Sequence, residues 1–315
     1  MASMDLSSDY ALFFPGQGSQ AVGMGKELFD ASPAARAVFE EADDALGFSI
    51  SKLCFEGPEE ELALTANTQP AILTCSIAAL AAAREIADLQ PKVALGHSLG
   101  EFSALVSVGA LRFADAVKLV RLRGQAMQEA VPEGVGAMAA IIGMELDELE
   151  ALCAKASTGD EKVSPANENG GGQVVVAGHA AAVQRLSDLA EEADARAIPL
   201  KVSAPFHCGL MAPAAQRLAE ALVPVEIGSF TAPVIANVDA EANSDPSRVK
   251  ALLVEQVTSR VRWESSVRKA FHMGVAQGVE LGHGKVIRGL VRRIERGLKV
   301  FTFGSPAHAD VLQDG

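Results

Sequence analysis

The sequence is poor in several residue types whose abundance would indicate a special class of protein. Its 315 residues include one tryptophan, one tyrosine and four cysteines, at positions 54, 75, 153 and 208. So few scattered cysteines, with no CxxC pair, exclude a disulfide framework and favour reduced thiols in a cytosol. So few large aromatics give no sign of a stacking platform for nucleic-acid bases. No apolar run reaches the ~18–20 residues that span a bilayer.

The charge balance excludes further classes. The chain has 27 Lys and Arg against 40 Asp and Glu, a formal net charge of −13. This excess repels phosphate backbones, so we expect no nucleic-acid partner. The first residues show neither a signal-peptide nor a transit-peptide pattern, so we expect a cytoplasmic protein with no membrane partner. With 49% apolar and 21% charged residues, the chain is typical of a globular protein of one large or two moderate domains.

Alternation of strand and helix signals predicts an α/β fold with a parallel sheet covered by helices. In the first part of the chain we expect strands at 10–14 and 93–95 and helices at 25–45, 70–88, 99–108 and 115–130. After residue 204 we expect helices at 211–222, 246–258, 263–273 and 286–299, the last of them basic, and strands at 234–237 and 278–281.

The middle of the chain has a different pattern. Strands are expected at 136–143, 162–168, 173–177 and 196–202, with helices at 145–156 and 180–193. The order βαββαβ is typical of a small ferredoxin-like unit. We therefore predict an inserted subdomain at 133–203, while 1–132 and 204–315 form one larger α/β subdomain.

The sharpest local motif is Gly96-His97-Ser98-Leu99-Gly100, a G-x-S-x-G sequence between a predicted strand and a predicted helix. This is the context of a nucleophile elbow, in which a tight turn projects the serine hydroxyl and the helix N-terminus faces a developing oxyanion. Ser98 is therefore a candidate acyl acceptor. The alternative is a Gly/Ser turn that only caps the helix.

Six histidines could supply a base, and His207 is the first candidate. It lies in the loop Ser203 to Cys208, where the chain re-enters the larger subdomain and Pro205 stiffens the backbone. His283, in a Gly-His-Gly turn, comes second, and either could be a structural histidine. Cys208 next to His207 could be read as a nucleophile pair, but a small buried cysteine is the more common case.

Arg123 occupies the apolar face of the helix predicted at 115–130. At 100° per residue it falls between Val120 and Met127, while Arg121 falls on the polar face. An unpaired buried guanidinium is costly, so Arg123 needs an anionic partner. That partner is either an internal carboxylate or a substrate carboxylate gripped by two parallel hydrogen bonds.

Taken together, these segments resemble the malonyl-CoA:acyl carrier protein transacylase family, in its stand-alone bacterial type. The matching segments run in family order from about residue 11 to 300: Phe14-Pro15-Gly16-Gln17-Gly18-Ser19-Gln20, Gly96 to Glu101, Arg121-Leu122-Arg123-Gly124, Gly136 to Ala140, Asn167 to Gly178, Ala204-Pro205-Phe206-His207, Asn237-Val238-Asp239 and Gly282 to Leu290. One departure is His283, since the family usually has Gly-Pro-Gly where this chain has Gly282-His283-Gly284.

The resemblance assigns roles residue by residue. Ser98 matches the nucleophile and His207 its base, and Arg123 matches the arginine that holds the free carboxylate of malonate. The backbone N–H groups of Gln17 and Leu99 match the oxyanion hole. Gln256 matches the glutamine whose backbone carbonyl orients the histidine. The family fold, an α/β-hydrolase-like large subdomain with a ferredoxin-like insertion, agrees with the predicted element order.

The implied activity is ping-pong transfer of malonyl from malonyl-CoA to the phosphopantetheine thiol of acyl carrier protein, in fatty-acid biosynthesis. The resemblance implies no metal and no resident cofactor: coenzyme A arrives with the substrate, and the partner carries the phosphopantetheine. An acidic carrier protein would need a local basic surface on this acidic chain. The predicted C-terminal helix offers one, with Lys285, Arg288, Arg292, Arg293, Arg296 and Lys299.

Two other functions compete with this one. The first is a serine thioesterase or esterase with the triad Ser98, Asp239 and His283, in the chain order of α/β-hydrolases. The second is a non-catalytic module that binds carrier protein, whose function would survive replacement of Ser98.

Overall fold

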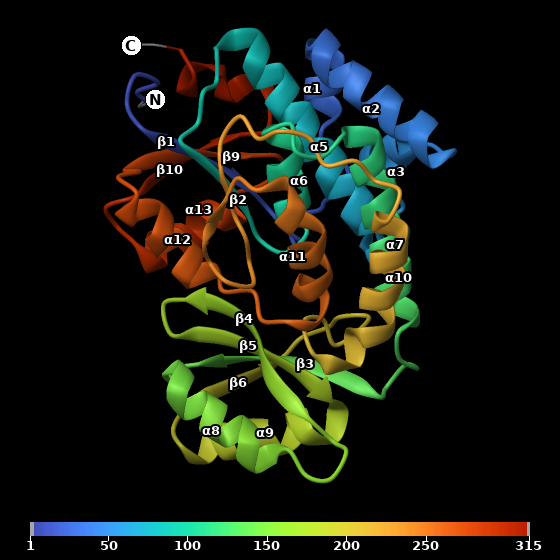
Figure 1. The fold of residues 1–315 in the computed structure, drawn as a ribbon, viewed down its shortest axis with the longest axis vertical. Coiled ribbons are helices and arrows are strands. Elements are labelled where there is room, and N and C mark those ends of the chain that lie inside the picture. Colours follow the sequence, from blue (N-terminus) through green and yellow to red (C-terminus); the bar gives the residue numbers. More distant parts are fainter. Residues whose placement is uncertain (1–2, 314–315) are drawn as a thin grey trace.

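The computed structural model describes residues 3–313 and consists of two sheets, each with its own helices (Figure 1). The larger sheet has the strand order β10-β9-β1-β2-β7-β8. Its strands are β1 (Tyr10–Phe14), β2 (Val93–Gly96), β7 (Val234–Ile235), β8 (Ala242–Asn243), β9 (Gln277–Leu281) and β10 (Lys299–Phe303). All neighbours pair in parallel except β7 with β8, which confirms the expected α/β class with a parallel sheet.

The central strands are buried on both faces, as expected for a parallel sheet that helices cover. Every residue of β1 and β2 is buried. Along β1, Leu12 and Phe14 face one core and Ala11 and Phe13 face the other, which is the period-two alternation of a strand. The helices of this unit are α1 (Lys26–Ala31), α2 (Pro33–Leu46), α3 (Ile50–Glu56), α4 (Glu59–Ala63), α5 (Thr65–Ile86), α6 (Gly100–Ser107), α7 (Phe113–Glu129), α10 (Ala212–Leu222), α11 (Pro246–Thr258), α12 (Trp263–His272) and α13 (Val286–Ile294).

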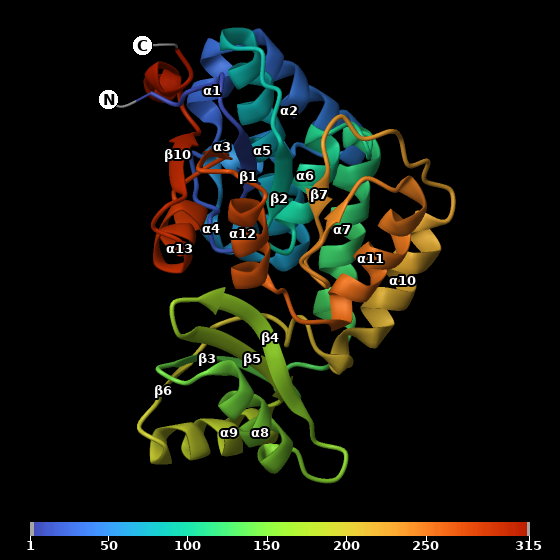
Figure 2. The same cartoon turned by 60° about the vertical axis from the view of Figure 1, so that its left-hand side comes forward.

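The smaller sheet is antiparallel, with the order β4-β5-β3-β6. It comprises β3 (Gly136–Ile142), β4 (Val163–Gly170), β5 (Gln173–His179) and β6 (Arg196–Pro199), and it carries α8 (Leu146–Ala156) and α9 (Ala180–Glu192). Both helices lie on the face turned away from the larger sheet (Figure 2). Of this sheet's side chains, Ala139 and Ile141 pack against α8 and α9, whereas Met138 and Ala140 join the core of the larger unit.

Backbone hydrogen bonds join β4 to the larger unit. The amide of Val261 donates to the carbonyl of Ala166 over 2.8 Å, and the amide of Glu168 donates to the carbonyl of Val261 over 2.9 Å. A strand-like bridge thus fixes the smaller sheet beside the start of α12. The smaller sheet consequently closes one side of any pocket at the carboxyl ends of β1 and β2.

Several expected elements differ in detail. The helix expected at 25–45 is two helices, because Ser32 leaves the helical conformation, and its hydroxyl caps α2 by accepting from the Ala35 amide. Helices α3 and α4, and the short strand β8, were not expected. The basic helix expected at 286–299 ends at Ile294, because the alternating residues 299–303 form the edge strand β10. Arg296 therefore lies in a turn and Lys299 on a strand.

Within residues 3–313, no helix combines the length and the apolar character needed to cross a membrane.

Candidate active site

Ser98 lies in a sharp turn between β2 and α6. Its φ is +51°, in the left-handed region that a residue with a side chain rarely adopts. The turn requires glycine on both sides, because a Cβ at Gly96 would lie 2.0 Å from the carbonyl of Gly100. A Cβ at Gly100 would lie 2.3 Å from the carbonyl oxygen of Phe14. The strain and the two close approaches are what the nucleophile elbow requires.

Asn237 holds both arms of this turn. Its Nδ2 donates to the carbonyl of Gly96 over 2.8 Å, and its Oδ1 accepts from the Ser98 amide over 2.7 Å. The side chain is fully buried, just beyond β7. The turn is thus fixed from a neighbouring strand of the sheet, so it does not depend on its own strained backbone alone.

His207 lies directly beside the serine. Its Nε2 is 2.7 Å from Ser98 Oγ, and its Nδ1 is 2.9 Å from the backbone carbonyl of Gln256 on α11. The carbonyl can only accept, so Nδ1 carries the proton and Nε2 is left to accept from the serine hydroxyl. Burial, and next the nearby Arg123 cation, lowers the pKa of His207 to about 3. The imidazole is therefore neutral at physiological pH, as a general base must be.

Arg123 projects from α7 into the same place and is 2% exposed. It donates to the side-chain oxygen of Gln69 over 2.8 Å, to that of Gln256 over 2.9 Å, and to Ser98 Oγ over 3.2 Å. Among the described residues no carboxylate oxygen lies within 4.0 Å of it, and its Nε has no hydrogen-bond partner. Burial lowers its pKa to about 10, so it remains charged.

The anionic partner expected for this arginine is therefore not an ion-paired carboxylate of the described residues. Amide oxygens orient the guanidinium, and the nearby Glu101 carboxylate raises its pKa without forming an ion pair with it. A buried cation with free hydrogen-bonding capacity is a receptor for a ligand carboxylate.

These three side chains open into one cavity of about 140 Å³. Its lining comes from both units: Gln17, Gln69, His97, Ser98, Leu99, Arg123, Met127, Met138, Asn167, Leu200, Val202, Phe206 and His207. The wall is largely apolar, which strengthens the few polar contacts that a ligand would make there.

Gln17 and Leu99, expected to provide an oxyanion hole, both line this cavity. Leu99 immediately precedes the N-terminus of α6 and Gln17 follows β1. Neither backbone N–H donates to another residue in the part of the chain that the structure describes. Two free donors beside a nucleophile are the arrangement that stabilises a tetrahedral oxyanion.

The alternative triad is not assembled. The half-exposed carboxylate of Asp239 accepts from Arg248 over 2.9 Å and forms no hydrogen bond or ion pair with a histidine of the described residues. His283 is half-buried in its own turn and makes no hydrogen bond to Ser98. Ser98 has His207 as its only imidazole partner among the described residues, so the triad of Ser98, Asp239 and His283 is not formed.

Sequence reasoning missed several residues of the site. Gln69 and Asn237 orient Arg123 and the elbow, and Glu101 contacts Gln256. The ring of His97 packs at an angle of 58° against that of Trp263, with ring centroids 5.4 Å apart, and its Nε2 lies 2.8 Å from Asn169 Oδ1 of the smaller sheet. The sequence signal that could have revealed such residues is a polar side chain at a position expected to be buried, such as Gln69 near the start of the long apolar helix α5.

Across residues 3–313, no group of three or more His, Cys, Asp and Glu side chains could hold a metal ion.

Comparison with known proteins agrees with this geometry. Residues 12–303 match the family model described as acyl transferase domain. The chain is 49% identical over 300 residues to the malonyl CoA-acyl carrier protein transacylase of Bacillus subtilis (strain 168), covering 95% of this chain and 94% of that protein. It superposes on the acyl carrier protein S-malonyltransferase of Vibrio cholerae with a TM-score of 0.94 and 46% identity, covering 97% and 100% of the two chains.

A second similar structure is a malonyl-transacylase in complex with its type II PKS acyl-carrier protein, with a TM-score of 0.93 and 43% identity, covering 97% of this chain and 99% of that one. The family model spans most of the chain, and the named relative is similar over nearly its whole length. The chain therefore belongs to the acyl transferase domain family, and within it to the malonyl CoA-acyl carrier protein transacylases.

Proposed function

We propose that this protein is an acyltransferase that moves a malonyl group from malonyl-CoA to the phosphopantetheine thiol of acyl carrier protein, by way of an ester on Ser98. One observation carries the proposal. Ser98 Oγ lies 2.7 Å from a neutral imidazole and 3.2 Å from a buried guanidinium that forms no ion pair with a carboxylate of the described residues. The base and the carboxylate receptor thus both contact the nucleophilic oxygen atom.

In the first half-reaction, the hydroxyl proton of Ser98 passes to His207 Nε2 as the oxygen attacks the thioester carbonyl. The oxyanion lies against the N–H groups of Gln17 and Leu99, each worth about 3 kcal/mol of barrier. The carbon–sulfur bond then breaks, and the coenzyme A thiolate takes the proton from His207. Malonyl remains as an ester on Ser98.

In the second half-reaction, the carrier's thiol gives its proton to His207 and attacks that ester. The tetrahedral intermediate uses the same two N–H groups, and the proton returns to Ser98 as the new thioester forms. Each half-reaction restores the neutral imidazole. The chemistry needs no metal and no resident cofactor, since both thiols belong to the substrates.

Arg123 makes the site selective for an acyl group that ends in a carboxylate. The carboxylate forms charge-assisted hydrogen bonds with the guanidinium, whose Nε is free in the described structure. It also neutralises the cation that lowers the pKa of His207, so the bound substrate makes its own base stronger. An acetyl group does neither and leaves the buried cation unpaired.

We also propose the division of the chain into an α/β-hydrolase-like unit, 1–132 with 204–315, and a ferredoxin-like unit, 133–203. The order β4-β5-β3-β6 with two helices on one face supports the second assignment. The elbow at the carboxyl end of β2 supports the first. The four cysteines are free and buried, which suits the reducing cytoplasm we expect.

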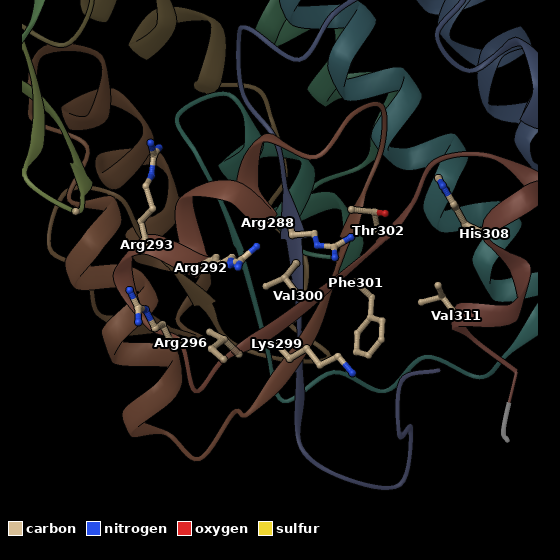
Figure 3. Close-up of a pocket in the computed structure, with 12 residues that line it drawn as sticks. Arg288, Arg292, Arg293, Arg296, Lys299, Val300, Phe301, Thr302, His308 and Val311 are labelled. Atoms are coloured by element: carbon tan, nitrogen blue, oxygen red, sulfur yellow. The ribbon is translucent and has the colours of Figure 1, made fainter. Parts of the chain in front are cut away.

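For the carrier protein we propose docking on the basic surface around α13. Its cationic residues are Lys285, Arg288, Arg292, Arg293 and Arg296, and none of them forms an ion pair within 4.0 Å with another described residue. All but Lys285 line a groove of about 1180 Å³, together with Lys299. Figure 3 shows Arg288, Arg292 and Arg296 spread along it. Unpaired cations in a broad groove suit an acidic partner.

Intact-mass analysis after mixing with malonyl-CoA tests the function. We expect a gain of one malonyl group, located on the peptide that contains Ser98 and removed by acyl carrier protein in its phosphopantetheine form. Ser98→Ala should gain nothing. Rapid release of free malonate without carrier protein would contradict the proposal and favour a thioesterase.

A further inference from the structure

Glu101, at the first turn of α6, is a buried carboxylate that the proposed mechanism does not use. It is 3% exposed. Its Oε2 accepts from the backbone N–H of Asn237 over 2.9 Å and from Nε2 of Gln256 over 2.8 Å. A buried carboxylate is costly, so a carboxylate kept in this position calls for a physical reason.

Each of its two partners holds part of the catalytic site. The side chain of Asn237 joins the carbonyl of Gly96 to the amide of Ser98 and so fixes the elbow. Glu101 forms no hydrogen bond with that side chain. It holds the backbone of the same residue, and thereby the position from which the side chain reaches the turn.

Gln256 forms hydrogen bonds with all three functional residues. Its Nε2 donates to the carbonyl of Ser98 over 3.0 Å, its Oε1 accepts from Arg123 over 2.9 Å, and its backbone carbonyl is 2.9 Å from His207 Nδ1. Because Nε2 also donates to Glu101, the carboxylate determines which end of the amide faces the guanidinium. The amide thereby stands between Glu101 and Arg123.

We propose that Glu101 is a positioning residue for malonyl transfer: by accepting from Asn237 and Gln256 together, it holds the elbow, the guanidinium and the imidazole in register. The inference rests on the proposed function. It also explains why Arg123 is free for substrate. An amide oriented by Glu101 presents an oxygen to the guanidinium and keeps the carboxylate itself from pairing with it.

The charge state of Glu101 gives this role a pH dependence. The pKa of Glu101 is raised to about 7, mainly because the carboxyl is buried. The Asp239 carboxylate also raises this pKa, whereas the hydrogen bonds from Gln256 and Asn237 and the Arg123 cation lower it. Above that pH the carboxylate accepts from both donors with a full charge. Below it the group is neutral and both hydrogen bonds weaken. Transfer should therefore decline as the pH falls through about 7, far above the pKa of about 3 for His207.

The test uses the first half-reaction, so that the carrier's thiol does not contribute to the pH profile. The rate of coenzyme A release on malonylation of Ser98 is measured from pH 5.5 to 8.5 for the wild type and for Glu101→Gln. Glutamine keeps an acceptor oxygen but cannot ionise. The matched control is Glu280→Gln, since Glu280 is also buried and also accepts two N–H groups, from Ile287 and Arg288 at the start of α13.

We expect the rate of coenzyme A release by the wild type to fall as the pH decreases through about 7, which gives an acid limb in the pH profile. Glu101→Gln should lack it and remain about tenfold below the wild type above pH 8, the loss that corresponds to one weakened hydrogen bond. Glu280→Gln should keep the wild-type profile. A wild-type limb that persists unchanged in Glu101→Gln, or a flat wild-type profile, would overturn the inference. A wild type that never loads malonyl on Ser98 would instead overturn the proposed function.

A second measurement needs no variant and so does not depend on folding of a mutant. The amide resonance of Asn237, which donates to Glu101 Oε2, is followed by NMR in the wild type over the same pH range. We expect a titration with a midpoint near 7. A resonance that does not move with pH would show that Glu101 does not change its charge there and would overturn the inference.

Discussion

Replacing Arg123 with alanine tests the selectivity argument most directly. The guanidinium is buried, is oriented by the amide oxygens of Gln69 and Gln256, and has no ion-paired carboxylate among the described residues. In Arg123→Ala the malonyl carboxylate enters an apolar cavity without its partner. A hydrogen bond to a charged group is worth about 1.5–3 kcal/mol, and an unpaired buried charge costs more.

Taken together, we expect a loss of about 3–4 kcal/mol for malonyl transfer, which is roughly 10²- to 10³-fold in kcat/KM. Acetyl transfer has no carboxylate to lose, so it should change far less. The ratio of kcat/KM for malonyl-CoA to that for acetyl-CoA, with acyl carrier protein as acceptor, should therefore fall by about two orders of magnitude.

The same variant has a predicted pH signature. The Arg123 cation is one cause of the low pKa of His207, so its removal raises that pKa. Because the base works only when neutral, activity is present above this pKa and lost as the pH falls through it. The acid limb that His207 sets in acetyl transfer by Arg123→Ala should thus lie at higher pH than in the wild type.

Arg121→Ala is the matched control, because Arg121 lies on the opposite face of α7. There it binds Asn67 and stacks 5.0 Å from the ring of Phe48. Both transfer rates should stay within a few-fold of the wild type. An unchanged malonyl-to-acetyl ratio in Arg123→Ala would refute the reasoning.

Three further outcomes follow from the structure. The double variant Arg292→Glu, Arg293→Glu should raise the Michaelis constant for acyl carrier protein about tenfold in steady-state kinetics; an equal rise for malonyl-CoA would contradict docking at α13. Gly96→Ala should lower the melting temperature and the yield of folded protein, because its Cβ would lie 2.0 Å from the carbonyl of Gly100; a wild-type melting curve would disprove the close approach. The folded-state pKa of Glu101, raised to about 7 from 4.5, makes the folded protein bind the proton more tightly. The carboxyl's contribution to the free energy of unfolding is therefore fully present below about pH 4.5 and is lost as the pH rises to about 7. Denaturant unfolding should show that slope in the wild type and its absence in Glu101→Gln.

The sequence predicted the elements that have strong local patterns. The strands at 10–14 and 93–95, the helix at 246–258 and the order of strands and helices in the middle segment are found close to their expected bounds. The predicted bounds are wrong where a short local signal interrupts a longer helical pattern. At Ser32 a single cap divides one expected helix, and after Ile294 an alternating edge strand replaces the end of another.

The sequence by itself also determined which residues are candidates for the chemistry, because a G-x-S-x-G turn and an arginine on an apolar helix face are local features. It left open which histidine serves the serine and what compensates Arg123. Only the tertiary structure brings the candidates together, since the imidazole beside Ser98 lies 109 residues along the chain and the Gln256 amide beside Arg123 lies 133 residues along it. Polar networks such as that around Gln256 and Glu101 consist of such long-range contacts, and no periodicity in the chain encodes them.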